Sequence, residues 1–142
     1  MTRGEIVAAA REWVGTPYRH QAATLGAGCD CLGLLRGVWR RLYGEEPMEV
    51  PNYRADWRDA RHADSLRAAA DQLLVAADGE PRAGQVLLFQ LGRTAAPKHC
   101  GIAIEAGRFI HAQEGLGVIE ANLSDGWRKR IAGLYEFPGV TN

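Results

Sequence analysis

The hydrophobic pattern of this 142-residue chain changes near Pro81, and that change restricts the folds available to it. Before Pro81 apolar residues recur at helical spacing, whereas after it short apolar runs alternate with glycine turns, as in strands. Helices followed by an antiparallel meander predict an α+β domain with the N-terminal helices packed on the sheet. No internal repeat or long linker divides the chain, so we expect a single domain over residues 1–142.

The expected elements follow from this periodicity and from local caps and breakers. Thr2 and Glu5 form a capping box for the first helix, and Gly44 ends the second. The pattern predicts helices over Thr2–Val14, from Cys31 to Gly44 and over Asp64–Ala77, an ordered loop over Glu45–Arg61, and strands over Gln85–Gln90, His99–Glu105, Arg108–Ala112, Val118–Asn122 and Leu134–Phe137.

The charge balance excludes some classes of function. Seventeen basic and seventeen acidic residues give a formal net charge of zero, whereas proteins that bind nucleic acid or anionic membranes need a basic excess. No run reaches the ~18–20 apolar residues of a membrane span, so no membrane insertion is expected. Glu5, Arg11 and Glu12 interrupt the start of the chain, where a secretory signal would be apolar. We therefore expect synthesis in the cytoplasm without a signal peptide.

The three cysteines are Cys29, Cys31 and Cys100, an odd number that does not suggest a disulfide framework. A metal site made of these cysteines and His99 would have poor ligand spacing, because Cys29 and Cys31 are not a CxxC pair. No metal or organic cofactor is therefore expected.

Cys31 is the best candidate for a reactive thiol. It stands where a loop becomes a helix, in GCDCLGLL, and the unpaired N–H groups at a helix start favour thiolate over thiol. His99 begins one predicted strand and His111 lies in the next, so both could face a helix packed on the sheet. A thiolate, an imidazole and a third polar group form a nucleophilic triad. Cys29 remains an alternative nucleophile, and Cys100 is expected to point away from His99.

The hairpin between the two histidines tests this triad. A plain two-residue turn at Ala106 and Gly107 would place His99 and His111 on opposite faces of the sheet. A three-residue loop over Glu105–Gly107, or an equivalent bulge, would bring His111 opposite Gly101. His99 would then be its diagonal neighbour, ~7–8 Å away at the backbone. The triad requires the loop or the bulge.

Four segments then carry a resemblance to a known family. They are WVGTPY (Trp13–Tyr18), GCDCLGLL (Gly28–Leu35), PRAGQVLLF (Pro81–Phe89) and HCGIAIEAGRFIHA (His99–Ala112). In this order, over nearly the whole chain, they resemble the NlpC family of papain-like cell-wall cysteine peptidases. The stretches GTPYRHQ, GCDC and RGVWRRLYG resemble its small phage-encoded group, which includes peptidases of gene-transfer-agent tails.

The resemblance implies a role for each matching residue. Cys31 would be the nucleophile, His99 the base and His111 the group that orients it. Tyr18 would lie beside the nucleophile, near the oxyanion or the substrate, and Asp30 would bind the substrate's amino group or cap the helix. The segment His20–Ala22 departs from the aromatic residue and two glycines common in relatives, which leaves the cleft mouth and the substrate preference open.

The resemblance also implies a papain-like fold and a function. The expected activity is hydrolysis of peptide-stem amide bonds in bacterial peptidoglycan, at a γ-D-glutamyl–diamino acid bond. The expected location is a phage tail or tail-like particle that acts on the periplasmic cell wall, with tail or baseplate proteins as partners and the Glu45–Arg61 loop as the first candidate docking surface. Two alternatives stay open: a structural tail component with a vestigial site, and an amidase or acyltransferase on the same scaffold.

Overall fold

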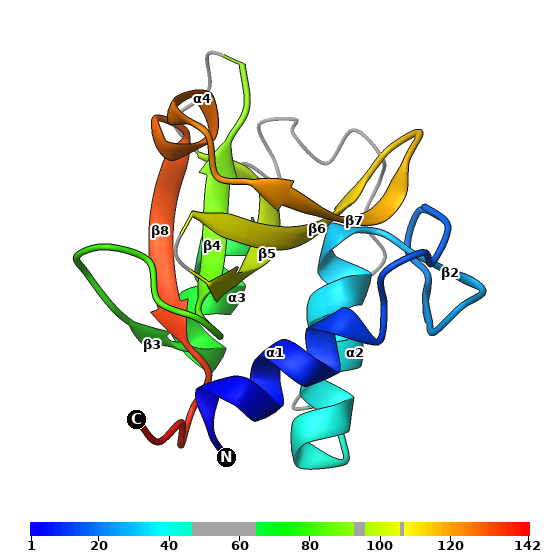
Figure 1. Ribbon diagram of the computed structural model, residues 1–142, viewed down its shortest axis with the longest axis horizontal. Coiled ribbons are helices and arrows are strands. Elements are labelled where there is room, and N and C mark those ends of the chain that lie inside the picture. The colour runs from blue at the N-terminus through cyan, green and yellow to red at the C-terminus, as the bar shows by residue number, and fades with distance from the viewer. Residues whose placement is uncertain (47–64, 93–95, 106) are drawn as a thin grey trace.

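The computed structural model describes residues 1–46, 65–92, 96–105 and 107–142. Within these ranges the helices are α1 (Arg3–Arg11), α2 (Cys31–Tyr43), α3 (Ser65–Leu73) and the short α4 (Asp125–Arg128). Figure 1 shows α1 and α2 crossing beside the sheet, with α3 behind it and α4 at the opposite end from the chain termini.

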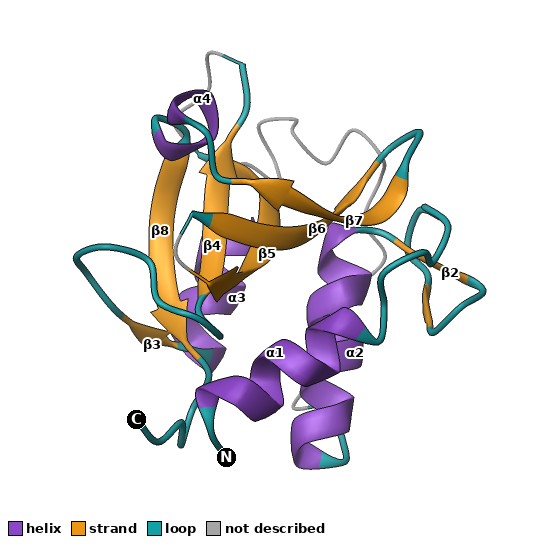
Figure 2. Ribbon diagram, in the orientation of Figure 1, coloured by secondary structure: helices purple, strands orange, loops and turns teal. Residues whose placement is uncertain are grey.

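The strands form one large sheet and one small hairpin (Figure 2). The hairpin consists of β1 (Ala23–Thr24) and β2 (Gly28–Cys29). The large sheet contains β3 (Val75–Ala76), β4 (Val86–Gln90), β5 (Pro97–Glu105), β6 (Arg108–Gln113), β7 (Gly117–Asn122) and β8 (Ile131–Glu136). Its order is β3-β8-β4-β5-β6-β7, and every pairing is antiparallel. The prediction of an α+β domain with an antiparallel sheet is therefore confirmed.

Both faces of the large sheet are covered by apolar side chains. Along β4, Val86 and Leu88 pack with the helices in the larger cluster, whereas Leu87 and Phe89 belong to a smaller cluster on the other face. All four side chains are fully buried. Because both faces of the strand are covered, its sequence is continuously apolar and does not alternate between apolar and polar residues. Each such burial stabilises the fold by about 1.5–3 kcal/mol.

The crossing of α1 and α2 depends on one glycine. Trp13, just after α1, lies directly against the backbone of α2 at Gly37. A Cβ atom at Gly37 would lie 1.9 Å from Cζ2 of Trp13, so only glycine allows this close approach. The indole is 4% exposed and joins the larger cluster, so it fixes α1 against α2.

Helix boundaries differ from the expected ones for local reasons. The first helix ends at Arg11 rather than Val14, because the N–H groups of Trp13 and Val14 donate to carbonyls three residues back and tighten the turn. The α3 helix ends at Leu73, and the next residues form β3, which pairs with Tyr135 and Glu136 of β8. A distant pairing partner therefore overrides the helical pattern of this alanine-rich stretch.

Besides β3, three short elements were not predicted: β1, β2 and α4. Two of them contain only two residues, and α4 has four, so each is too short to produce a periodic signal. The α4 helix does carry a local mark, because the Ser124 hydroxyl caps it by accepting from the Trp127 N–H.

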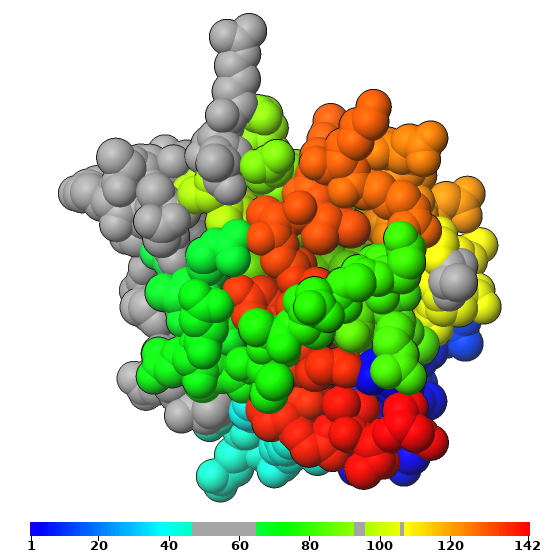
Figure 3. All heavy atoms as spheres, turned by 90° about the vertical axis from the view of Figure 1, so that its left-hand side faces the viewer, coloured from blue at the N-terminus to red at the C-terminus, as the bar shows by residue number. Residues whose placement is uncertain are grey.

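The two ends of the described chain lie side by side (Figure 1). The N–H of Thr141 donates to the carbonyl of Met1 at 2.8 Å, and Thr2 pairs with Thr141 in a parallel bridge. The space-filling view shows residues of α3 and β3 lying directly against those of the C-terminal segment (Figure 3). Among the described residues no helix is long and apolar enough to cross a membrane.

The expected loop over Glu45–Arg61 lies outside the described residues except for its first two positions. The carboxylate of Glu46 accepts from Arg36 Nε at 2.6 Å and from Arg40 Nη1 at 3.3 Å. These two α2 arginines are therefore paired with a residue that lies just after the helix.

Alanine substitutions at two helical glycines, Gly37 and Gly4, should have opposite effects. Gly37→Ala inserts a methyl group into the Trp13 ring and should lower the free energy of unfolding by about 1–3 kcal/mol. Gly4→Ala lies on the exposed side of α1, where a Cβ would meet nothing closer than 3.8 Å. It should raise the free energy by ~0.5–1 kcal/mol through helix propensity. Urea unfolding measures both, and equal effects would contradict the close packing at Gly37.

Candidate active site

The start of α2 is fixed by a buried carboxylate. Asp30 is the N-cap residue, and its Oδ1 accepts from the Gly33 N–H at 2.7 Å. Its Oδ2 accepts from the Gln21 N–H, also at 2.7 Å, and the side chain is 2% exposed. Asp30 therefore holds both the helix start and the preceding loop, which places the next residue, Cys31, at the first position of the helix.

The loop that contains Gln21 and Ala22 packs directly against the backbone of α2 at Gly33. A Cβ at Gly33 would lie 1.9 Å from the Ala22 carbonyl oxygen, so glycine is required two positions after the cysteine. Gln21 has a φ of 63°, a left-handed conformation that is unusual for a residue other than glycine. The hydrogen bond from its N–H to Asp30 offsets part of that strain.

Asp30 and Tyr18 were the two predicted substrate-binding residues. Of the two roles considered for Asp30, the structure shows the helix cap, while the role toward a substrate amino group stays a prediction. The Tyr18 backbone forms a parallel bridge with Cys29, and its side chain packs at the edge of the larger cluster. Its predicted role near the oxyanion is not tested by these contacts.

The two predicted histidines are hydrogen-bonded to each other. His99 Nε2 lies 2.8 Å from His111 Nδ1. Glu105 pairs with Arg108, so the first of the two alternatives, the three-residue loop, is not formed, but the register shifts between Ala103 and Glu105. That irregularity is the equivalent bulge, because it makes Ala103 the partner of Phe109 and brings both histidines to one face.

This face carries the smaller apolar cluster and is opposite to the face on which α1 and α2 pack, and Trp127 of α4 lies over it. The rings of Phe89, Phe109 and Trp127 surround the pair, with centroids 4.5–5.9 Å from one or other imidazole. His111 is 1% exposed, and its Nε2 has no hydrogen-bond partner among the residues that the structure describes. Burial, and then the charge of His99, lower the pKa of His111 to about 3, so His111 is neutral near pH 7.

Because His111 is neutral, the hydrogen-bond direction can be assigned. A charged His99 donates through Nε2, so His111 Nδ1 accepts and the His111 proton resides on Nε2. The free nitrogen of His99 is then Nδ1, which is left to face a reacting group. The pair is thus arranged to hold His99 in one orientation.

The three thiols differ sharply in acidity. A hydrogen bond with Cys100, followed by the hydrogen bond and charge of His99, lowers the pKa of Cys31 to about 5 against the opposing effect of burial. Burial raises the pKa of Cys29 to about 12. Hydrogen bonding to Cys31, together with burial, raises the pKa of Cys100 well above its usual value. Cys31 is therefore the thiol that is ionised near neutral pH, which favours it over Cys29 as the nucleophile.

Two residues at this site were not among the sequence candidates. Cys100 points away from His99 as expected, and its Sγ donates to the Cys31 carbonyl oxygen at 3.3 Å. Trp127 of α4 packs on both histidines. The position of Cys100 directly after His99 was a usable signal, whereas the placement of α4 over the sheet was not readable from local pattern. In the described ranges no three metal-binding side chains come together.

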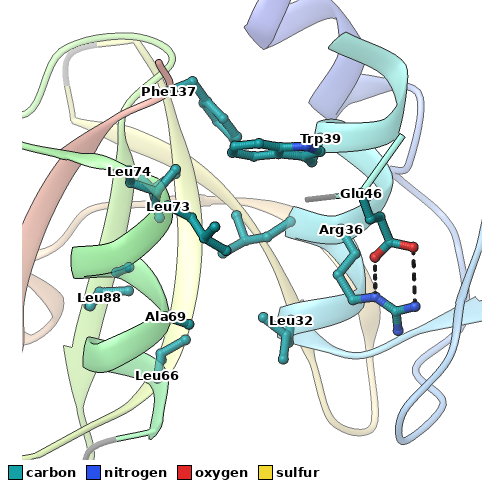
Figure 4. Close-up of a pocket in the computed structure, with 13 residues that line it drawn as sticks. Leu32, Arg36, Trp39, Glu46, Leu66, Ala69, Leu73, Leu74, Leu88 and Phe137 are labelled. Atoms are coloured by element: carbon teal, nitrogen blue, oxygen red, sulfur yellow. Dashed lines mark hydrogen bonds and ion pairs between the residues drawn. The ribbon is translucent and has the colours of Figure 1, made fainter. Parts of the chain in front are cut away.

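An apolar groove lies between α2 and α3, away from the predicted triad (Figure 4). It encloses about 750 Å³ including its open mouth, and Trp39 and Phe137 close one end with ring centroids 6.3 Å apart. Its lining residues are mainly leucines and alanines and do not include Cys31, His99 or His111. The groove therefore offers no chemistry of its own.

Comparison with known proteins points to one family. The model of the NlpC/P60 family matches residues 15–136. A gamma-DL-glutamyl hydrolase of Bacillus subtilis is 28% identical over 137 residues, 96% of this chain and 30% of that protein. The murein DD-endopeptidase MepS/murein LD-carboxypeptidase of Escherichia coli K12 is 28% identical over 120 residues, 84% of this chain and 54% of that protein. The chain thus spans about half or less of these relatives.

Solved structures agree on the fold. The NlpC/P60 domain of the peptidoglycan hydrolase SagA matches with a TM-score of 0.60 at 23% identity, covering 96% of this chain and 98% of that one. An NlpC/P60 family protein from Bacillus cereus ATCC 10987 matches with a TM-score of 0.67 at 20% identity, covering 96% of this chain and 40% of that one.

Alkylation should identify the ionised thiol. Iodoacetamide near neutral pH should modify Cys31 well before Cys29 or Cys100, measured by peptide mass spectrometry. Because the pKa of Cys31 is about 5 rather than 9.0, its rate should stay nearly constant from high pH down to pH 6 and fall only as thiolate is protonated near 5. Preferential labelling of Cys29, or a rate that already falls below pH 9, would contradict the assignment.

Proposed function

The chain belongs to the NlpC/P60 family, and from that premise we propose that it is a cysteine peptidase that hydrolyses peptide-stem amide bonds of bacterial peptidoglycan. One observation carries the chemistry. The thiol of Cys31, at the start of α2, has a lowered pKa and is hydrogen-bonded to His99, which the neutral His111 orients. The relatives named as a murein endopeptidase and a peptidoglycan hydrolase support the substrate class.

The first half of the proposed reaction forms an acyl-enzyme. The Cys31 thiolate attacks the carbonyl carbon, and the resulting oxyanion lies near the positive end of the α2 dipole, with Tyr18 as the further predicted contact. His99, charged and held by His111, donates its Nδ1 proton to the departing amine. The C–N bond breaks, and a thioester on Cys31 remains.

The second half releases the product. Neutral His99 accepts a proton from water through Nδ1, and the hydroxide formed attacks the thioester carbonyl. The C–S bond breaks, the Cys31 thiolate is restored and a carboxylate leaves. Since His111 stays neutral throughout, the protons move only between His99, water and the substrate.

We assign the scissile bond as γ-D-glutamyl–diamino acid. The Bacillus subtilis relative is named a gamma-DL-glutamyl hydrolase and matches 96% of this chain, which supports a γ-linked glutamyl group as the acyl part. The His20–Ala22 segment borders the loop held by Asp30, and His20 Nδ1 lies 3.8 Å from Asp30 Oδ2. This segment is therefore the part of the site where the preference of this chain would differ from that of relatives.

Digestion of purified peptidoglycan tests the activity. The wild-type protein should release peptides with a newly exposed amino group on the diamino acid, identified by mass spectrometry. Cys31→Ala should reduce peptide release to background, and His99→Ala should reduce it by about 10²–10⁴-fold. His111→Ala should reduce release by less than His99→Ala, because His111 acts only through His99. Cys29→Ala serves as the control and should cut normally. Retained cutting by Cys31→Ala would overturn the mechanism, and fragments cut elsewhere would overturn the bond assignment.

We further propose that the enzyme travels on a phage tail or gene-transfer-agent particle and docks on tail or baseplate proteins. The resemblance of GTPYRHQ, GCDC and RGVWRRLYG to the phage-encoded group supports this location. The docking surface would lie outside the catalytic site, with the segment from Glu45 to Arg61 as the first candidate.

Purified particles test this location. They should contain the protein in fixed stoichiometry, and particles carrying Cys31→Ala should assemble normally but penetrate the wall less efficiently. If particles lack the protein, a lysis or remodelling enzyme replaces the tail assignment. If particles contain it but neither they nor the purified protein cut peptidoglycan, the structural alternative holds. Transfer of the acyl group to an acceptor other than water would favour the acyltransferase.

A further inference from the structure

Two consecutive residues of β5 approach the nucleophile from different sides. His99 lies on the face of the sheet that carries Phe109 and Trp127, whereas Cys100 lies on the face that packs against the helices. Cys100 is fully buried, and its strand partner on β4 is Leu88. A single strand therefore brings both an imidazole and a thiol to the start of α2.

The thiol of Cys100 makes a polar contact with the nucleophile's own residue. Its Sγ donates to the Cys31 carbonyl oxygen at 3.3 Å. That carbonyl belongs to the first residue of α2, so the contact joins the helix start to the strand that carries His99. No methyl or methylene group at this position could make it, because the contact requires a donor.

We propose that Cys100 is a positioning residue of this active site: its thiol holds the first residue of α2 against β5 and donates to the Cys31 sulfur when that sulfur is anionic. The proposal rests on the proposed function only in taking Cys31 as the nucleophile. In the resting site the proton points to the Cys31 carbonyl oxygen, and rotation about the Cys100 Cβ–Sγ bond turns it toward the thiolate.

The electrostatics of the site agree with this role. A thiolate that is 8% exposed has lost most of its hydration, so it needs protein donors in place of water. The groups that act on it are Cys100 and His99, which favour the charge, and Asp30, which opposes it. The pKa of Cys100 is raised well above its usual value, so this thiol keeps its proton and remains a donor while Cys31 is ionised.

Three substitutions separate donation from packing. Cys100→Ser keeps a donor at the same position, Cys100→Ala removes it, and Cys100→Val fills the space without a donor. The rate of Cys31 alkylation by iodoacetamide is followed from pH 4 to pH 9 by mass spectrometry. The Cys100→Ala and Cys100→Val substitutions should move the midpoint of the Cys31 titration to higher pH and lower the alkylation rate at pH 5 about tenfold. The Cys100→Ser protein should stay close to wild type. Cys29→Ala removes the other buried cysteine and should leave the profile unchanged.

The outcomes are distinct. Cys100 would only fill space if the Cys100→Val protein kept the wild-type pH profile of alkylation. The same conclusion would follow if Cys100→Ser shifted the midpoint of that profile as far as Cys100→Ala does. Since Ala or Val substitution can reduce folding, an infrared measurement on the Cys29→Ala protein provides a second test. The remaining Cys100 S–H band should move to lower frequency as Cys31 ionises, and an unmoved band overturns the proposal. If the thiolate forms normally but peptidoglycan is not cut, the substrate assignment fails and this inference stands.

Discussion

The buried carboxylate of Asp30 is the interaction on which the rest of the site depends. Its two oxygens accept from Gly33 within α2 and from Gln21 in the preceding loop, so one side chain fixes two backbone segments. The desolvation cost of burying this charge is offset by two charge-assisted hydrogen bonds and by the helix dipole. Cys31 follows directly, and its position is therefore set by a local cap rather than by distant packing. An apolar residue at position 30 would leave both N–H groups without their partner.

The second constraint is the pairing of β5 with its neighbours. The irregularity between Ala103 and Glu105 changes the register by one residue, which moves the whole of β6 from one face to the other relative to β5. Because of this shift, His111 reaches His99, and both enter the aromatic cluster around Trp127. The cluster excludes water, which keeps His111 neutral and leaves His99 as the histidine of the pair that can exchange a proton with the reacting groups. A strand irregularity thus selects which imidazole does the chemistry.

These two constraints explain which parts could be predicted from the sequence. The cap, the helix start at Cys31 and the β4-β5-β6-β7 meander depend on neighbours close in sequence, and local pattern described them well, whereas the pairing of β8 with β4 and β3 was not predicted. The need for a bulge was also predictable, because two histidines twelve positions apart share a face only if the register shifts. The position of the register shift and the contact of Cys100 with Cys31 could not be predicted. The contact joins two residues that are 69 positions apart in the sequence, and it depends on how closely α2 packs against β5. The packing of Trp127 over the pair follows from a four-residue helix with no periodic signal.

Catalytic chemistry and substrate choice reside in different kinds of structure here. The reacting groups lie on α2, β5 and β6, whose positions are fixed by the helix cap and the sheet register. The neighbouring loop contains His20 and the left-handed Gln21, and it is held to that frame by the Asp30 carboxylate and by backbone hydrogen bonds to Cys29 and Asp30. A left-handed conformation costs about 1–3 kcal/mol for a residue other than glycine, and the hydrogen bond from Gln21 to Asp30 helps to offset that cost. Changes of sequence at His20 and Ala22 can therefore alter the mouth of the site without moving the thiol.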